Sequence, residues 1–392
     1  MHNRVNHQQN WIDKDGIVSL APGRPALVSV VLPVYNQAQY LGHAIDGVLD
    51  QSYPDLELII VNDGSTDGIE HVLDRYRHIP NVSIINQANQ KLPRALNNGF
   101  VHAKGEFYSW TSADNIMLPN QVERLVRYLQ DHPDAAMVYS DYQAIDDAGD
   151  PLNDPTFRPH NLDGSDRSII RLPHGVTESN FHDSGDNFIG ASFMYRRGAA
   201  WFIGDYSADT FGGEDYDYWL RMSNFFAIGH LPEVLYKYRV HGNTLNARAA
   251  ELKIFKRVRK VLQRDAALRA CLQDYRKSPP PQNLDEAVSR LRAREILVYD
   301  YSRGYGRLEA RRSLWRKPFR VCSIDVPADA VDEKELGLAD MIVTKDPGCF
   351  AKFSPRFQTN IFCFDIERQP ELLARLAVYR EFMLRNVGSR HR

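Results

Sequence analysis

The chain has 392 residues, of which 43% are hydrophobic and 25% are charged, and its formal net charge at pH 7 is -2. This length and composition provide enough apolar surface for a large core and favour two domains. A nearly neutral chain lacks the positive field that nucleic-acid-binding proteins use, so we expect no nucleic-acid partner. No apolar run approaches the length of a membrane span, and the polar residues 2–15 do not resemble a signal peptide.

The cysteines lie in the last third of the chain, at Cys271, Cys322, Cys349 and Cys363. Because no two of them form a CxxC pair, the sequence indicates neither a zinc site nor a disulfide framework. We therefore expect a reducing, cytoplasmic compartment.

The first part of the chain alternates apolar strands with amphipathic helices. Strands are predicted at residues 27–32, 56–61, 82–85, 107–111 and 136–140, and helices at 40–49, 68–77, 94–103 and 121–131, the last one opening at 117–119. This alternation predicts βαβ units, and hence an α/β fold with a mostly parallel sheet flanked by helices.

The pattern changes at residues 146–187, where Asp, Pro, Gly and His dominate and a long surface excursion is expected. A strand at 234–240 and a basic helix at 249–276 follow, and the Pro-rich residues 278–281 mark a boundary. The remainder predicts a smaller Rossmann-like α/β module, with strands at 296–299, 319–324, 341–344 and 361–364 and a helix at 371–385. The expected domains are an extension (1–26), the main domain (27–248), a basic helical linker (249–280) and the C-terminal module (281–392).

Polar motifs follow several of these strands. Pro33-Val34-Tyr35-Asn36 follows the first strand, Asn62-Asp63-Gly64-Ser65 the second, and Ala113-Asp114-Asn115 the strand at 107–111. Open α/β sheets bind ligands at the carboxyl ends of their strands. A lone carboxylate at such a place is suited to a hard divalent cation that also takes phosphate oxygens. Farther along the chain, Glu214-Asp215 precede an aromatic helix and His241 follows the strand at 234–240.

In this order, the motifs resemble those of the family 2 inverting glycosyltransferases, which have the GT-A fold; the resemblance covers about residues 27–246. It implies transfer of a sugar from a nucleoside-diphosphate sugar, for which we expect UDP, to a glycan or lipid-linked acceptor. Mn²⁺ or Mg²⁺ would stabilise the charge on the leaving diphosphate. A carboxylate on the far side of the sugar would take the acceptor's proton, and direct displacement would invert the anomeric carbon.

The resemblance also assigns roles to residues. Pro33, Tyr35 and Asn36 would border the nucleotide, Asp63 would accept the imide N–H of uracil, and Arg94, with Asn97, would face the nucleotide. Asp114 would bind the metal, and His241 would complete the metal shell or bind a phosphate. Ala113 stands where the family has a first acid that helps to hold the ribose. Asp215 would be the general base, and Glu214 would contact the acceptor hydroxyl.

Each motif also has a structural interpretation. Residues 63–65 suit an ordinary turn and cap, acids at 214–215 suit a helix N-terminus, and a lone histidine after a strand is usually structural. Asp217 and the tryptophans, Trp219 above all, suit structural or core positions. The basic helix is either a solvated helix between domains or a peripheral contact with anionic lipid at the inner membrane face.

Two functional alternatives remain at this point. A nucleotidyltransferase would open with a Gly-rich basic loop, where this chain has Tyr35-Asn36-Gln37. A nucleotide-sugar or glycan-binding module without turnover is favoured by Ala113.

Overall fold

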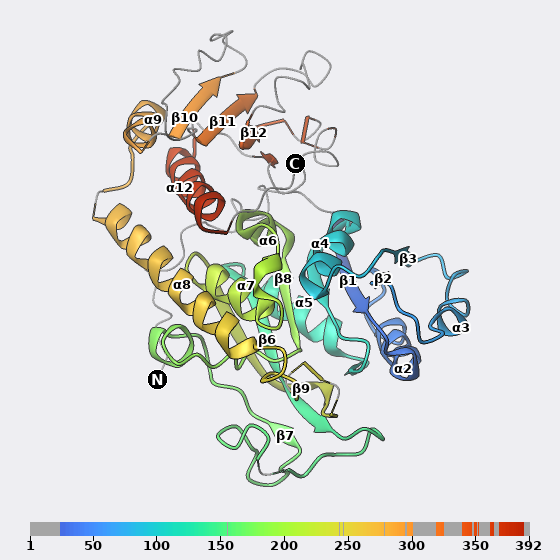
Figure 1. Ribbon diagram of the computed structural model, residues 1–392. Helices are drawn as coiled ribbons and strands as arrows, with labels where there is room; N and C mark the ends of the chain where they lie inside the picture. The colour runs from blue at the N-terminus through green and yellow to red at the C-terminus, as the bar shows by residue number, and fades with distance from the viewer. Residues whose placement is uncertain are drawn as a thin grey trace. The chain divides into compact units, whose positions relative to one another are not determined.

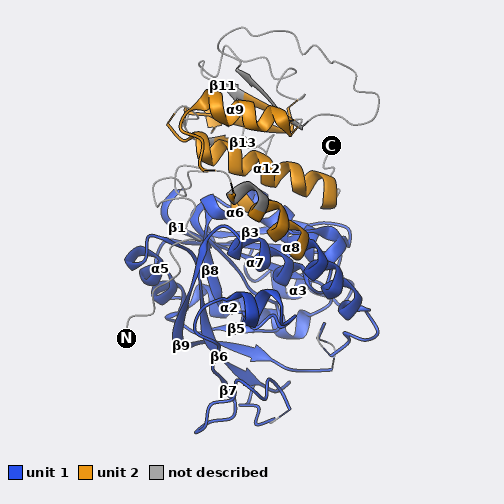
Figure 2. Ribbon diagram, turned by 90° about the vertical axis from the view of Figure 1, so that its left-hand side faces the viewer, with its two compact units in different colours: residues 1–10, 23–199, 206–265 blue, residues 11–22, 200–205, 266–392 orange. Residues whose placement is uncertain are grey.

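In the computed structural model, the described residues are 24–154, 156–242, 244–245, 247–277, 279–294, 296–300, 319–324, 339–346, 349–350, 352, 361–363 and 368–387. The predictions for residues 1–23, Asn243, Ser278 and Phe364 lie outside them. Apart from residues 1–22, the chain forms two compact units (Figure 2): the first takes in Gly23–Ala199 and Tyr206–Asp265, the second Ala200–Asp205 and Ala266–Arg392. The domain boundaries expected from the sequence remain predictions.

The first unit is built on one large sheet (Figure 1). Its strands are β1 (Arg24–Val34), β2 (Leu56–Asn62), β3 (Val82–Asn86), β4 (Gly105–Trp110), β5 (Ile116–Met117), β6 (Ala135–Ile145), β7 (Ile169–Ile170), β8 (Phe193–Arg196) and β9 (Ala227–Arg239). They lie in the order β3-β2-β1-β4-β8-β6-β9-β5, and β7 pairs with β6. The pairs among β3, β2, β1 and β4 are parallel, as is β6 with β9, whereas β8, β7 and β5 run antiparallel to their neighbours. The predicted α/β fold with a mostly parallel sheet is confirmed.

Helices cover this sheet because each presents an apolar stripe. The helical elements are α2 (Ala38–Leu49), α3 (Glu70–Leu73), α4 (Leu92–His102), α5 (Gln121–Asp131), η1 (Glu178–His182), α6 (Arg197–Ile203), η2 (Ala208–Thr210), α7 (Glu214–Ser223) and α8 (Ile254–Arg276). In α5 the buried residues Val122, Leu125, Val126 and Leu129 recur at helical spacing, and the helix packs on β6, β8 and β9. Helix α4 packs on β1 and β2.

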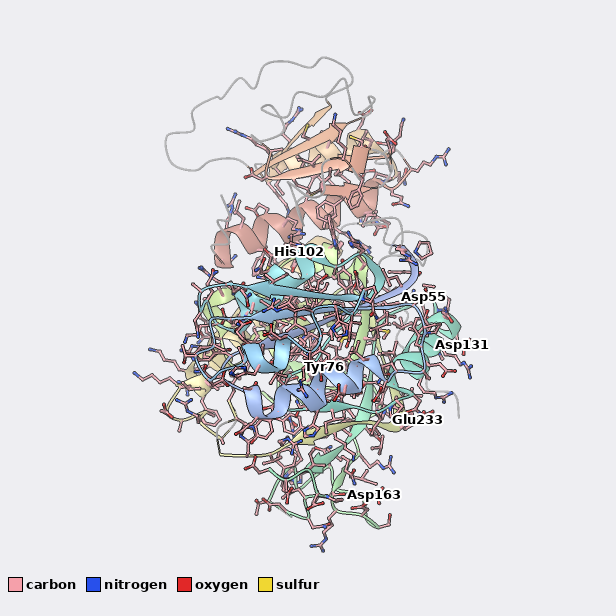
Figure 3. All side chains as sticks on the ribbon, turned by 90° about the vertical axis from the view of Figure 1, so that its right-hand side faces the viewer. Asp55, Tyr76, His102, Asp131, Asp163 and Glu233 are labelled. Carbon is pink, nitrogen blue, oxygen red and sulfur yellow. The ribbon has the colours of Figure 1, made fainter. Side chains whose placement is uncertain are left out.

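Side chains on the helices and on the loops after them add polar contacts. The Tyr76 hydroxyl donates to Asp46 of α2 at 2.7 Å, and Arg124 of α5 donates through Nε to Glu233 of β9 at 2.8 Å. Figure 3 labels Tyr76 and Glu233 among the side chains of this unit.

Three predicted helices differ from the observed ones. Met117, expected to open a helix, lies in β5 opposite Tyr236, and α5 starts after Pro119 at Gln121. Helix α3 has four residues, because the chain beyond it continues in i→i+3 turns such as Tyr76 N–H to Leu73 O. The basic helix starts at Ile254, because Lys253 has a φ of 54°, which no α-helix accommodates.

The second unit contains the predicted smaller sheet. Its strands, β10 (Ile296–Asp300), β11 (Phe319–Ile324), β12 (Met341–Thr344) and β13 (Ile361–Cys363), pair in parallel in sequence order. Helix α9 (Leu284–Ala293), which the sequence analysis missed, packs against α12 (Pro370–Val387) and β10. Asn283 caps α9 by accepting the N–H of Glu286 at 2.9 Å. Among the described residues, no helix combines the length and apolar character that a membrane crossing requires.

Candidate functional site

The carboxyl ends of six strands lie along one edge of the large sheet, and the end of β3, at Asn86, lies opposite that of β2. Strands β1, β2 and β4 are parallel, and β4 and β6 are both antiparallel to β8, so β6 runs in the same direction as β1; β9 is parallel to β6. The chain therefore leaves the sheet on this edge after Val34, Asn62, Asn86, Trp110, Ile145 and Arg239. Backbone bonds hold the first exits together: Asp63 N–H donates to Val34 O at 2.9 Å, and Thr111 N–H donates to Val31 O at 3.0 Å.

We call the loops that follow these strand ends exit loops. Asn36 joins the exit loop of β1 to that of β2 by hydrogen bonds. Its φ of 52° turns the chain, its N–H donates to Ser65 Oγ at 3.0 Å, and its Oδ1 accepts the Thr66 N–H at 2.8 Å. Pro33 is buried in β1, whereas 47% of Tyr35 is exposed. The Nζ of Lys91 lies 5.9 Å from the centre of the Tyr35 ring. The exposed ring of Tyr35 could thus stack on a nucleotide base, and the ammonium group of Lys91 beside it could contact a phosphate.

Asp63 holds the loop that precedes α4. It is 3% exposed, and its Oδ1 accepts from Gln87 Nε2 and from Gln90 N–H, both at 2.7 Å. Its Oδ2 accepts from Lys91 N–H at 2.9 Å. A carboxylate offers about four lone-pair sites, so one site on Oδ2 remains for a ligand. The assignment of Asp63 to the uracil imide stays a prediction; its role in the loop was not anticipated.

The two α4 residues differ in environment. Arg94 is exposed and reaches Gln90 Oε1 at 3.5 Å. Asn97 is engaged at both ends of its amide: Nδ2 donates to Tyr206 O at 2.9 Å, and Oδ1 accepts the Tyr206 N–H at 2.8 Å. Asn97 therefore anchors the segment before α7, while Arg94 is open to solvent.

Asp114 and His241 meet at the sheet edge, although they lie 127 positions apart. Nε2 of His241 is 3.1 Å from Asp114 Oδ2, and Gln37 Nε2 donates to the same oxygen at 3.0 Å. Arg239 Nε donates to Asp114 O at 2.8 Å and its guanidinium lies 5.0 Å from the Tyr40 ring centre. Tyr40 in turn lies against His241 and donates its hydroxyl to Asp147. The sequence analysis did not identify Gln37, Tyr40 or Asp147.

This contact offers one carboxylate oxygen and one imidazole nitrogen to a cation. Ala113 beside it is fully buried and contributes no ligand, and among the described residues no three His, Cys, Asp or Glu side chains form a cluster able to hold a metal ion. Mg²⁺ commonly keeps several waters and takes one or two protein carboxylates together with phosphate oxygens. The pair thus fits an ion that arrives with a diphosphate.

The acid pair at the start of α7 lies in two different environments. Glu214 is 3% exposed, and its Oε2 accepts the N–H of Gly212 at 2.5 Å. Burial, and then the charge of Asp215, raise the pKa of Glu214 to about 8. Asp215 is half-buried; burial raises its pKa as well, opposed by hydrogen bonds from Tyr216 N–H and Asn187. Two neighbouring buried acids repel each other when both are ionised, so the pair favours holding one proton and one negative charge.

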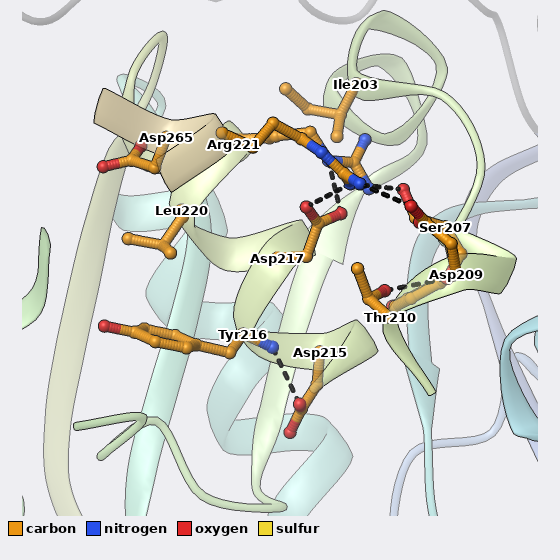
Figure 4. Close-up of polar contacts among 12 residues, drawn as sticks. Ile203, Ser207, Asp209, Thr210, Asp215, Tyr216, Asp217, Leu220, Arg221 and Asp265 are labelled. Atoms are coloured by element: carbon orange, nitrogen blue, oxygen red, sulfur yellow. Dashed lines mark hydrogen bonds and ion pairs between the residues drawn. The ribbon is translucent and has the colours of Figure 1, made fainter. Parts of the chain in front are cut away.

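Asp217, one helical turn deeper, is enclosed by arginines (Figure 4). Arg221 Nε donates to its Oδ2 and Arg264 Nη1 donates to its Oδ1, both at 2.9 Å. Arg264 also donates to Ser207 Oγ at 3.2 Å and to Asp209 Oδ2 at 2.8 Å. These buried contacts fix α7 against α8 and η2, which agrees with a structural role for Asp217. Trp219 is fully buried, as expected for a core residue.

Comparisons with known proteins concern the first unit of the chain. Residues 29–204 match the family model described as glycosyl transferase family 2. An uncharacterized glycosyltransferase of Rickettsia typhi is 32% identical over 222 residues, which cover 55% of this chain and 64% of that protein; one of Haemophilus influenzae is 30% identical over 234 residues, covering 55% and 66%. The chain thus spans slightly less than two thirds of these relatives.

Among solved structures, S. aureus TarS in complex with UDP is similar, with a TM-score of 0.46, 16% identity, and coverage of 61% of this chain and 65% of that one. Glu214, Asp215 and His241 lie outside the residues matched by the family model, whereas the exit loops of β1, β2 and β4 lie within them. The part of the chain that contains these loops thus resembles glycosyl transferase family 2, which its family model matches over residues 29–204.

Proposed function

We propose that this protein is an inverting glycosyltransferase that moves a sugar from a nucleoside-diphosphate sugar, UDP-linked by our expectation, to a glycan or lipid-linked acceptor. The observation that carries the proposal is the contact between Asp114 and His241 at the edge where the nucleotide loops end. The match of residues 29–204 to the family model supports the reaction class.

The donor would bind across the exit loops. Tyr35 offers its exposed ring to the base, Asp63 keeps one lone-pair site, and Lys91 and Arg94 offer positive charge. Asp114 and His241 would hold Mn²⁺ or Mg²⁺, which when bound stabilises negative charge on the leaving diphosphate. For this role Nε2 of His241 must carry no proton, because a protonated ring nitrogen has no lone pair with which to bind a cation.

The acceptor would be activated at α7. Asp215 would take the proton of the acceptor hydroxyl while the acceptor oxygen bonds to the anomeric carbon and the bond from that carbon to the diphosphate breaks. Asp215 suits a base better than Glu214 does, because Asp215 is only half-buried, whereas Glu214 is buried and its raised pKa of about 8 keeps it protonated at neutral pH. Glu214 is buried beside Asp215. Because protonated Glu214 carries no charge, it does not repel the negative charge of the Asp215 carboxylate.

The experiment is product formation from a panel of UDP-, GDP- and other nucleotide sugars with Mn²⁺, using simple glycans and lipid-linked sugars as acceptors. Sugar transfer that Asp215→Asn abolishes supports the proposal. UDP binding without transfer under every condition would instead favour the binding module. The feature on that side is the buried Ala113, which stands where the resemblance implies an acid that helps to hold the ribose.

Peripheral contact with an anionic membrane is one of the two interpretations of residues 249–276, and we keep it as a proposal for the exposed residues alone. Phe255 is 72% exposed, and Lys256 and Arg259 beside it are exposed. Lys260 and Arg264 are occupied by Asp209 and Asp217 within the domain. Cosedimentation with phosphatidylglycerol vesicles that Phe255→Ser reduces would support this contact; equal sedimentation of both proteins would contradict it.

A further inference from the structure

Asn187 connects the long excursion to the acid pair. It lies at the end of the excursion, directly before the buried Phe188, and its Nδ2 donates to Asp215 Oδ2 at 2.9 Å. The other oxygen, Oδ1, accepts the N–H of Tyr216 at 2.7 Å. The Asp215 carboxylate is therefore held at both oxygens, once by its own helix and once by the excursion.

The excursion itself is anchored around Asn187. Arg158 Nη2 donates to the Asn187 carbonyl oxygen at 2.5 Å, and Nη1 pairs with Asp186. The φ of Arg158 is 49°, a conformation that non-glycine residues adopt rarely and that persists where surrounding contacts fix it. Phe157 stacks on Tyr238 of β9, with ring centroids 5.8 Å apart and an angle of 17°. These contacts determine where the Asn187 amide stands.

The amide has one feature that a purely structural contact would lack. Its Oδ1 is buried and has no hydrogen-bond partner within the described part of the chain. Leaving a buried acceptor unpaired is unfavourable. The donor end of the amide faces Asp215, which suits an ionised carboxylate. Rotation by half a turn would bring Oδ1 to Asp215, which suits a protonated carboxyl group that donates its O–H.

We propose that Asn187 is a positioning residue for Asp215: its amide holds the ionised carboxylate ready to take a proton, and it rotates to accept the O–H once Oδ2 of Asp215 carries that proton. The inference rests on the proposed function, in which the proton comes from the acceptor hydroxyl. After product release the proton leaves to solvent and the amide returns to its first orientation.

The charges around Asp215 give the direction of the expected effect. Glu214 precedes it on α7, Tyr206 lies near it from the segment before η2, and Arg158, which pairs with Asp186, acts on it from the excursion. The hydrogen bond from Asn187 and the charge of Arg158 lower the pKa of Asp215 against the effect of burial. Loss of the Asn187 amide must therefore raise that pKa.

The test compares kcat and KM across the acid range in the wild type, Asn187→Ala, Asn187→Asp and the control Asn180→Ala. We expect kcat to fall about tenfold in Asn187→Ala, with the acid limb moved up by about one pH unit, a tenfold change in proton affinity. The KM for the nucleotide sugar should stay within about twofold, because the amide does not contact the donor. Asn187→Asp, which is isosteric and adds a like charge, should move the limb farther.

The control separates positioning from folding. Asn180 lies in the same excursion and completes the capping box of η1, where its Oδ1 accepts the Thr177 N–H at 2.7 Å, but no described bond joins it to Asp215. Asn180→Ala should lower the melting temperature and leave the acid limb in place. If the acid limb of Asn187→Asp stayed at the wild-type pH, the inference would be overturned, whether or not Asn187→Ala folds. The proposed function would still stand in that case, provided that the wild type transfers sugar and Asp215→Asn does not. Absence of transfer in the wild type would overturn both.

Discussion

The most direct physical prediction concerns the buried proton on Glu214. The pKa of this carboxyl rises from 4.5 in the ordinary state to about 8 in the fold, because the side chain is buried and Asp215 lies beside it. As pH rises through the range between these values, the unfolded chain has released the proton and the folded chain has not. The folded state then binds more protons, so the free energy of unfolding falls as pH increases.

The size of the effect follows from the shift. The difference between 8 and 4.5 is 3.5 units, and at 1.36 kcal/mol per unit it amounts to an upper limit of about 5 kcal/mol. The shared proton between Glu214 and Asp215 makes the true value smaller. In Glu214→Gln, the side chain keeps the shape of the glutamic acid and is uncharged at every pH. Relative to the wild type, it should gain stability steadily through this window, with no further gain on either side of it.

The assay is denaturant unfolding of wild type and Glu214→Gln at a series of pH values. A matched control is Glu251→Gln, because Glu251 is exposed and Arg248 lowers the pKa of its carboxyl. The control should not reproduce the gain. If the stabilities of wild type and Glu214→Gln changed in parallel with pH, Glu214 would be ionised in the fold at neutral pH, and the assignment of the base to Asp215 would lose its main physical support.

Three further predictions concern the site. Asp114→Asn should abolish Mn²⁺-dependent binding of UDP in calorimetry, and His241→Ala should weaken it less; UDP binding by the wild type that is insensitive to EDTA would contradict a metal role for both. Asp63→Ala should weaken UDP binding by roughly ten- to a hundredfold, because it removes a charge-assisted hydrogen bond and the anchor of the loop before α4. The control Asn98→Ala, which removes a hydrogen bond to Gln87 in that loop, should have a smaller effect. Equal UDP affinities in the two variants would mean that Asp63 only holds the loop. Asp215→Asn should reduce kcat by about a hundred- to ten-thousandfold with UDP affinity within a few fold, and wild-type turnover in this variant would make Glu214 the next candidate.

Much of the fold follows from local patterns. The strands β1 and β2 read as continuous apolar runs because both of their faces are buried, and the apolar stripe of α5 predicted residues 121–131, although its opening was expected at 117–119. The antiparallel strands were harder: β7 and β5 have two residues each, too few for a periodic pattern to appear. Helix α9 was missed because its apolar positions are spaced among many charged ones.

The site shows the same division. Residues at strand ends, such as Asp63, Asp114 and His241, could be proposed from the sequence because their places in the chain carry the signal, and their roles stay predictions. Asn187, Gln37 and Tyr40 were missed because their roles depend on which loops meet in space. A possible signal for Asn187 was its position where apolar periodicity resumes after the excursion. The occupied lone pairs of Asp63 could not be inferred either, since they depend on the path of residues 87–91.

The turn before α7 determines which of its two acids is buried. Gly212 has a φ of 84°, and a Cβ at this position would lie 2.7 Å from two side-chain carbons of Ile254. Neighbouring helix residues point about 100° apart, so the residue at which the helix begins sets the angular phase of both acids. A shift by one residue would bring Asp215 to the buried position of Glu214, or Glu214 to the half-buried position of Asp215. The turn at Gly212 therefore determines which acid is buried, although the glycine itself carries no functional group.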